Sequence, residues 1–163
     1  RELDIPALIQ DTVRIAAPAV QTGNFEVKID ATPHFPAVLA DEIRLRQVLL
    51  NLMSNAFKFT TEGGKITVSA RINDAGEPEF SVRDTGIGIA ETDIPHVMAP
   101  FGRLEQAVID NDRGTGLGLP LSKSLIELHG GTFRISSELG VGTAVTFTLP
   151  AHRAIYRQSQ AIG

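Results

Sequence analysis

The sequence contains no cysteine, which excludes disulfide bonds and metal sites built on thiolates. It also lacks a long apolar run: the longest stretches, such as residues 48–50, are far too short to cross a bilayer. Nothing at the N-terminus resembles a signal peptide. Neither sign of charge is in large excess, since the net charge is only −4. That balance gives no reason to expect nucleic acid or an anionic membrane as the main partner.

What is present fits one ordinary soluble domain. The chain has 163 residues, enough to bury a core, and 42% of them are hydrophobic. The first residue is arginine rather than methionine, so we expect a piece of a longer protein. No repeat or low-complexity segment interrupts it. We expect one domain over residues 1–150 and a C-terminal tail over residues 151–163.

Hydrophobic periodicity predicts three helices and five strands. Apolar residues at helical spacing predict helices over residues 4–21, 41–59 and 117–129. Alternating or short apolar runs predict strands over residues 25–29, 65–72, 79–84, 132–137 and 143–149. The order mixes strands and helices without strict alternation. We therefore expect the α+β class, a two-layer sandwich with one mixed sheet of about five strands backed by about three helices.

The helix predicted over residues 41–59 carries a polar stripe beside its apolar face. At about 100° per residue, five polar side chains fall within an arc of about 80°: Arg44, Gln47, Asn51, Asn55 and Lys58. Asparagine is a mediocre helix former, so two of them one turn apart invite an explanation. An amide oxygen suits Mg²⁺, and a lysine supplies charge for phosphates. A solvated helix face is the alternative that this helix alone leaves open.

Two glycine-rich segments follow predicted elements. In the first, Asp84 ends a strand, where its carboxylate can accept a hydrogen bond from an exocyclic amine such as that of adenine. Gly86 and Gly88 would let the backbone approach a flat ring closely, but this pattern alone is weak, because a tight turn after a strand also produces it.

In the second segment, Gly114, Gly116 and Gly118 open a helix, where unpaired backbone amides suit phosphate. The spacing GxGxG after an irregular stretch does not match a dinucleotide fingerprint. The Lys-Ser/Thr pair of a Walker loop is absent too.

Taken in chain order, four segments resemble the nucleotide-binding boxes of histidine kinases: NLMSNAFKFT, DTGIGI, APFGR and GTGLGLPLSKSLIELHGG. Histidine kinases belong to a wider ATPase family with DNA gyrase, Hsp90 and MutL. The ending GTFRISSELGVGTAVTFTLP resembles the closing hairpin of the same lobe, and the opening ELDIPALIQDTV resembles the segment after the dimerisation helices. The resemblance covers about residues 1–150.

The resemblance implies a role for each box. Asn51, Asn55 and Lys58 would be the catalytic residues, with Asn55 as the magnesium ligand. Asp84 would read the adenine amine. The nucleotide-binding residues would be Asp84, Gly86, Gly88, Ile89, Phe101, Arg103, Gly114, Thr115, Gly116, Leu117, Gly118, Leu119 and Thr143.

The resemblance also implies a flexible ATP lid. Phe101 would anchor its start, Arg103 would contact phosphate, and Gly114, Gly116 and Gly118 would form its far hinge. Two positions depart from the family pattern. Ala99 replaces a common acidic residue, and Pro120 replaces a more usual alanine, which should stiffen the hinge.

Asn51 stands where gyrase-like and Hsp90-like relatives have a glutamate that activates water. An amide is no general base at neutral pH, so the nucleophile must come from elsewhere. Histidine kinases use a histidine on a separate helical domain. None of His34, His96, His129 and His152 lies in such a setting, and His129 reads as a structural residue at a helix C-terminus.

The resemblance therefore implies binding of ATP and Mg²⁺ and transfer of the γ-phosphoryl group to a histidine on an absent dimerisation domain, then to a response regulator. We expect this fragment to be cytoplasmic and monomeric. The longer protein is expected to be a homodimer, and an anchor in the bacterial inner membrane would suit it. Three alternatives remain: a degenerate lobe acting as a regulatory binding module, a gyrase- or Hsp90-like ATPase, and a protein-serine kinase of the anti-sigma type.

Overall fold

The computed structural model describes residues 1–23, 26–32, 34–60, 63–98 and 118–156, which form two layers. One layer is a five-stranded sheet with the order β2-β4-β5-β7-β6. Its strands are β2 (Glu26–Ala31), β4 (Lys65–Ile72), β5 (Pro78–Asp84), β6 (Thr132–Glu138) and β7 (Gly142–Thr148). Only β2 and β4 are parallel neighbours, and the other pairs are antiparallel. The sheet is therefore mixed, and the predicted fold class is confirmed.

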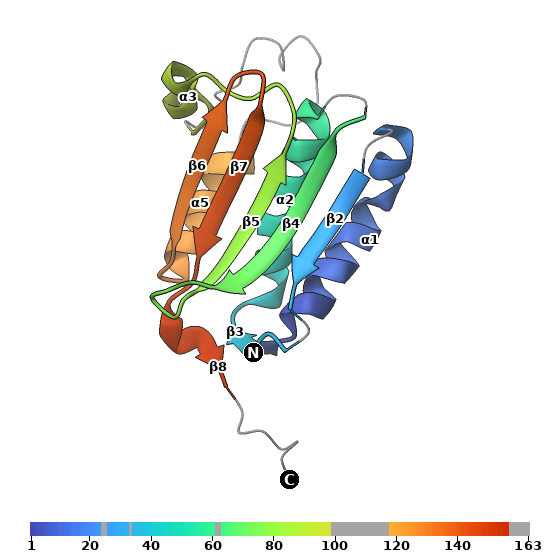
Figure 1. Cartoon of the computed structure of the whole chain (residues 1–163). Coiled ribbons are helices and arrows are strands. Elements are labelled where there is room, and N and C mark those ends of the chain that lie inside the picture. The colour runs from blue at the N-terminus through green and yellow to red at the C-terminus, as the bar shows by residue number, and fades with distance from the viewer. Residues whose placement is uncertain (24–25, 33, 61–62, 99–117, 157–163) are drawn as a thin grey trace.

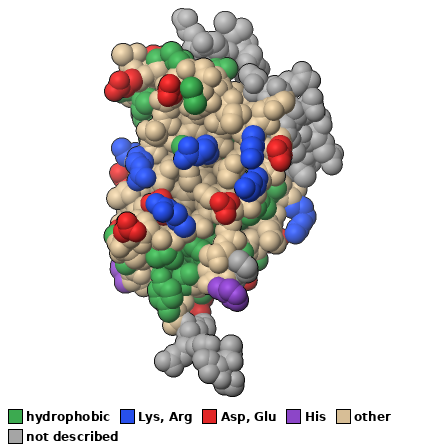
Figure 2. All heavy atoms as spheres, viewed as in Figure 1, with side chains coloured by type: hydrophobic (Ala, Val, Ile, Leu, Met, Phe, Trp, Pro, Cys, Tyr) green, Lys and Arg blue, Asp and Glu red, His purple; other side chains and the backbone are tan. Residues whose placement is uncertain are grey.

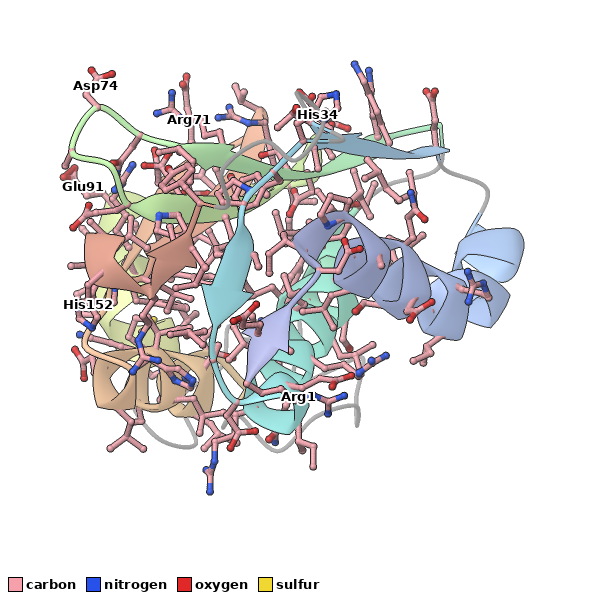
Figure 3. All side chains as sticks on the ribbon, turned by 90° about the horizontal axis from the view of Figure 1, so that it is seen from below. Arg1, His34, Arg71, Asp74, Glu91 and His152 are labelled. Carbon is pink, nitrogen blue, oxygen red and sulfur yellow. The ribbon has the colours of Figure 1, made fainter. Side chains whose placement is uncertain are left out.

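Three helices form the second layer and cover one face of the sheet, as Figures 1 and 3 show. They are α1 (Ile5–Gly23), α2 (Glu42–Phe59) and α5 (Gly118–Leu128). The short η1 (Glu91–Asp93) and α3 (Ile94–Met98) follow β5. Each long helix lies within a few residues of its predicted bounds, because each carries an apolar face at helical spacing.

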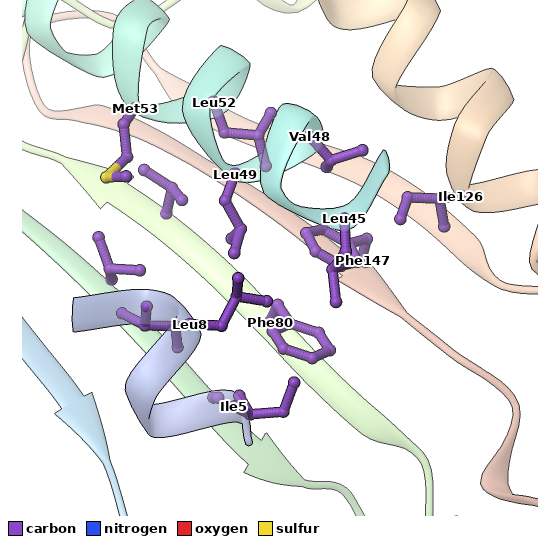
Figure 4. Packing of buried hydrophobic residues seen from close by; sticks show 14 of the residues in the cluster. Ile5, Leu8, Leu45, Val48, Leu49, Leu52, Met53, Phe80, Ile126 and Phe147 are labelled. Carbon is purple, nitrogen blue, oxygen red and sulfur yellow. The ribbon is translucent and has the colours of Figure 1, made fainter. Parts of the chain in front are cut away.

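The core lies between the two layers. The inner face of the sheet contributes Phe80 and Phe147, whose ring centroids lie 4.8 Å apart in a stacked pair. The register sets Phe80 opposite Phe147, so both rings face the helices. Helix α2 packs onto them with its apolar face, as Figure 4 shows. Its buried residues are Leu45, Val48, Leu49, Leu52, Met53 and Ala56.

Helix α2 has well-defined ends. The Oδ1 atom of Asp41 accepts a hydrogen bond from the backbone N–H of Arg44 at 3.1 Å, which is an N-cap. That bond to the Arg44 backbone, together with the charge of Arg44, lowers the pKa of the Asp41 carboxyl. At the other end, the N–H of Thr60 donates to the carbonyl of Ala56. The buried face and both ends fix the orientation of the polar stripe.

The outer face of the sheet is polar and carries several Lys and Arg side chains (Figure 2). The register places Lys28, Thr67 and Arg83 in one row across three strands. Arg71 lies on the same layer and pairs with Glu79 at 3.1 Å (Figure 3). Because this face meets water, its polar residues alternate with the buried ones.

A small second sheet, β1-β3-β8, was not predicted. Its strands are β1 (Glu2–Leu3), β3 (Ala37–Leu39) and β8 (Ala154–Ile155), and η2 (Ala151–Arg153) precedes β8. Arg153 secures this region, because its guanidinium donates to the carbonyls of His129 and Leu39 at 3.0 and 2.8 Å. Residues 151–155 thus continue the ordered fold beyond the expected boundary at residue 150. Within the described ranges, no helix has the length and apolarity that a membrane crossing requires.

Candidate functional site

The polar stripe of α2 lies beside α5 and is partly exposed. Asn51, Asn55 and Lys58 are each half-buried. The Nδ2 atom of Asn51 donates to the Oγ atom of Ser122 on α5 at 3.3 Å, and Ser122 is fully buried. This bond turns the amide oxygen of Asn51 away from Ser122. Among the described residues, no hydrogen bond of the Asn55 side chain is found.

Lys58 occupies the last turn of α2. Its Nζ atom lies 5.8 Å from the centroid of the Phe59 ring, within the range of a cation–π contact. A cation at a helix C-terminus is favourable on electrostatic grounds. The stripe therefore ends in a positive charge beside the point where the Asp84 loop approaches α2.

Asp84 is a buried carboxylate at the end of β5. Its Oδ1 atom accepts a hydrogen bond from the backbone N–H of Gly86 at 2.8 Å. Burial raises the pKa of the Asp84 carboxyl, and backbone hydrogen bonds from Gly86 and Thr143 oppose that rise. A buried carboxylate with its acceptor capacity only partly used is suited to a donor on a ligand.

Gly86 brings the Asp84 loop onto the end of α2. A Cβ atom at this position would lie 2.1 Å from the carbonyl oxygen of Phe59, so only glycine permits the approach. The neighbouring N–H of Ile87 donates to the same carbonyl at 3.2 Å. The carboxylate and the polar stripe, which are far apart in the sequence, are thereby joined at one end of the domain.

The other side of this loop packs against the turn between β6 and β7. Gly88 has a φ of +75°, and a Cβ atom there would lie 2.1 Å from the carbonyl oxygen of Glu138. The N–H of Gly140 donates to the carbonyl of Ile87 at 2.8 Å, and the N–H of Ile89 donates to Ser137 Oγ at 2.7 Å. Both sides of the loop are therefore held by hydrogen bonds and close contacts.

The remaining described site residues complete this end. Thr143 is opposite Asp84 in the sheet register, so the two side chains share a face. Gly118 begins α5, and Leu119 packs against buried Ile89 and Val97. The structure thus brings together Asn51, Asn55, Lys58, Asp84, Gly86, Gly88, Ile89, Gly118, Leu119 and Thr143. Phe101, Arg103, Gly114, Thr115, Gly116, Leu117 and the expected lid lie outside the described residues.

Sequence reasoning missed two side chains of this region, Ser122 and Ser137. Ser122 contacts Asn51 across 71 positions of sequence, and Ser137 contacts Ile89 across 48. A serine within a helix or strand gives no signal of such a contact. His129 was predicted to be structural, and its contacts agree. Its Nδ1 donates to the Leu125 carbonyl at 2.9 Å, and its Nε2 accepts from the Asp41 N–H at 3.2 Å.

Comparison with known proteins identifies the family of the chain. A family model described as histidine kinase-, DNA gyrase B- and HSP90-like ATPase matches residues 40–153. A non-motile and phage-resistance protein of Caulobacter vibrioides is 41% identical over 148 residues, 89% of this chain and 18% of that protein. The cell-division control histidine kinase PdhS of Brucella canis is 33% identical over 155 residues, 90% of this chain and 15% of its own length.

Solved structures give the same result. Full-length ShkA in complex with AMPPNP superposes with a TM-score of 0.83 at 33% identity, over 97% of this chain and 32% of that one. The nucleotide-free catalytic domain of the histidine kinase ThkA gives 0.79 at 26% identity, over 93% of this chain and 97% of that one.

The chain spans less than a fifth of the length of the two curated relatives above, so its likeness to them concerns one domain. The family match covers more than half of the chain and includes α2, the Asp84 loop and α5. The chain belongs to the histidine kinase-, DNA gyrase B- and HSP90-like ATPase family, as a catalytic domain of the histidine kinase type.

Proposed function

We propose that this domain binds Mg-ATP and donates its γ-phosphoryl group to a histidine on a separate dimerisation domain. The observation that carries the proposal is the junction of Gly86 with Phe59, which holds the buried Asp84 carboxylate beside a helix that presents two amides and a lysine. That combination matches a nucleotide, which has a base with an exocyclic amine at one end and phosphates at the other.

Asp84 would accept a hydrogen bond from the adenine amine. Its carboxylate is buried, and a hydrogen bond to a charged acceptor is stronger than one between neutral groups. Gly86, Gly88 and Ile89 would line the base pocket, with Thr143 beside the carboxylate. The loop is already fixed on both sides, so little ordering would accompany binding.

Asn55, Lys58 and Asn51 would lie along the triphosphate. No group of three or more His, Asp or Glu side chains in the described ranges is arranged to hold a metal ion. Mg²⁺ usually retains water and shares phosphate oxygens, so a single amide ligand such as Asn55 fits it. When bound, the ion would neutralise phosphate charge, and Lys58 would add a fixed positive charge.

Asn51 decides which nucleophile can react. Its amide cannot take a proton from water, and its Nδ2 already donates to Ser122. An incoming imidazole nitrogen would form a bond to the γ-phosphorus while the bond to the bridging oxygen of ADP breaks. The domain then contributes positioning and charge, and the histidine belongs to the partner domain.

This function implies two partners for the longer protein. The first is its own dimerisation and phosphoacceptor domain, which would make the full-length protein a homodimer. The second is a response regulator, whose aspartate would receive the phosphoryl group. We place the domain in the cytoplasm, where ATP is available, and expect this fragment alone to be monomeric.

Phosphoryl transfer tests the proposal directly. The domain, γ-labelled ATP and Mg²⁺ are mixed with the histidine-bearing domain of the same protein, and we expect label on that histidine. Asp84→Asn should weaken nucleotide binding by about 10- to 100-fold: the one amide oxygen would accept from the Gly86 N–H, so the amide NH2 donor would face the adenine amine. Asn55→Ala should retain nucleotide affinity without Mg²⁺ but lose the increase that Mg²⁺ provides.

Two other outcomes would replace the proposal. Calorimetry that detects no binding of Mg-ATP would identify the domain as a regulatory module. Steady hydrolysis by the isolated domain, abolished in Asn55→Ala, would identify a gyrase- or Hsp90-like ATPase.

A further inference from the structure

Three oxygen-bearing side chains form a row across the end of the sheet. Asp84 on β5 is the register partner of Thr143 on β7, which is the partner of Ser137 on β6. Direct partners in an antiparallel ladder lie on the same face. Ile66, the partner of Asp84 on β4, is fully buried, so this row faces the helices and the base pocket proposed above.

The Oγ atom of Ser137 has three hydrogen-bond contacts. The backbone N–H of Ile89 donates to it at 2.7 Å. The carbonyl oxygen of Gly142 lies 3.0 Å away and can only accept. The Oγ1 atom of Thr143 lies 2.7 Å away, and either hydroxyl is able to donate across that contact.

Counting protons assigns the donor in the third contact. A serine hydroxyl has one proton and two acceptor lone pairs. If that proton goes to Gly142, the two lone pairs accept from Ile89 and from Thr143, and all three contacts are satisfied. If it went to Thr143 instead, the contact with Gly142 would contain no proton. The arrangement that satisfies every contact has Thr143 donating to Ser137.

We propose that Ser137 is a positioning residue that sets the choice of nucleobase by engaging the hydroxyl proton of Thr143. Thr143 then offers only lone pairs to a ligand, and Asp84 beside it offers only carboxylate oxygens. Adenine carries an amine donor where guanine carries a carbonyl acceptor. Two neighbouring acceptors bind the former and repel the latter. The inference rests on the proposed nucleotide site.

Ser137 also secures the loop that would line the base. Its bond to Ile89 joins that loop to β6, next to the close approach of Gly88 to Glu138. Loss of the Ser137 hydroxyl would therefore weaken the binding of every nucleotide to some extent. Only the loss of the contact with the Thr143 hydroxyl proton would change the ratio of the dissociation constants for adenine and guanine nucleotides.

The test is Ser137→Ala, with dissociation constants for Mg-ATP and Mg-GTP measured by calorimetry. Without Ser137, the Thr143 hydroxyl rotates and donates to the guanine carbonyl. The preference for ATP over GTP should therefore fall by about 5- to 10-fold. Thr143→Val removes the acceptor itself, so it should reduce the same ratio. Ser137→Thr retains a hydroxyl and should restore most of the preference.

Ser136→Ala is the matched control, because Ser136 is exposed on the same strand and its partner Ala144 belongs to the opposite face. The ratio of the dissociation constants for Mg-ATP and Mg-GTP in Ser136→Ala should equal that of the unmodified domain. If Ser137→Ala weakens ATP and GTP equally, Ser137 is only structural and the inference is wrong. If the unmodified domain binds neither nucleotide, the proposed function fails, and the inference fails with it. Thermal unfolding by circular dichroism identifies a variant that does not fold, and Thr143→Val then decides.

Discussion

Gly142 begins β7 and lies against the backbone of Asp84 and Thr85, so replacing it with alanine should disturb both the stability of the domain and the candidate site. Its φ is +146°, a conformation that alanine rarely adopts. A Cβ atom added there would lie 2.0 Å from the carbonyl oxygen of Asp84 and 3.0 Å from the Cα atom of Thr85. Ordinary contacts of a Cβ atom begin near 3.4 Å, so the Cβ atom and the Asp84 carbonyl must move apart by about 1.4 Å.

The cost follows from two effects. The unfavourable φ costs about 1–3 kcal/mol. Separation of the strands weakens about two ladder hydrogen bonds next to Thr143, each contributing about 1 kcal/mol. Gly142→Ala should therefore reduce the free energy of unfolding by about 3–5 kcal/mol. For a domain of this length, that corresponds to a fall in Tm of about 8–15 °C.

Gly140→Ala is the matched control from the same turn. Gly140 also has a positive φ, +79°, but a Cβ atom there meets nothing within 4 Å. This variant should cost only about 1–2 kcal/mol, from backbone conformation alone. Urea unfolding followed by far-UV circular dichroism measures both. If Gly142→Ala costs no more than Gly140→Ala, the close approach to Asp84 does not constrain the fold and the reasoning is wrong.

Three further predictions concern the carboxylate, the core and the junction of two helices. Burial raises the pKa of Asp84, so as pH falls from 7 towards 4 the parent should gain stability relative to Asp84→Asn, while nucleotide binding, measured by calorimetry, weakens. If the stabilities of the parent and of Asp84→Asn change in parallel with pH, the prediction is wrong. Phe80→Ala removes a ring stacked on Phe147 and should cost about 3–5 kcal/mol in urea unfolding. His129→Ala leaves the Leu125 carbonyl and the Asp41 N–H without their partner and should cost about 1–3 kcal/mol, whereas exposed Leu128→Ala should change stability by less than about 0.5 kcal/mol.

The large elements could be predicted from the sequence because each buries a periodic set of side chains. The apolar face of α2 and the alternation along β4 are examples, and both matched within two residues at each end. The small sheet could not be predicted, because β1 and β8 have two residues each and β3 has three. Such strands show no period, and their pairing depends on long-range contacts such as that of Arg153 with Leu39.

The candidate site divides in the same way. Asn51 and Asn55 stand out because asparagine is unusual at this spacing in a helix, and Asp84 stands out because glycines follow it. The sequence does not reveal what holds them. The contact of Gly86 with Phe59 and the bonds of Ser122 and Ser137 exist only once the layers have packed. Local patterns therefore indicated the candidate residues, and tertiary structure shows how they are positioned.

The length of α2 sets the distance between the small sheet, which contains β1, and the candidate site. It starts just after β3, the strand that pairs with both β1 and β8, and it ends where Phe59 meets the Asp84 loop (Figure 1). Its 18 residues rise by about 1.5 Å each, so roughly 27 Å separates the two points. Under the proposed function, a phosphoacceptor histidine must therefore be brought to the Phe59 end of α2, roughly 27 Å from the small sheet.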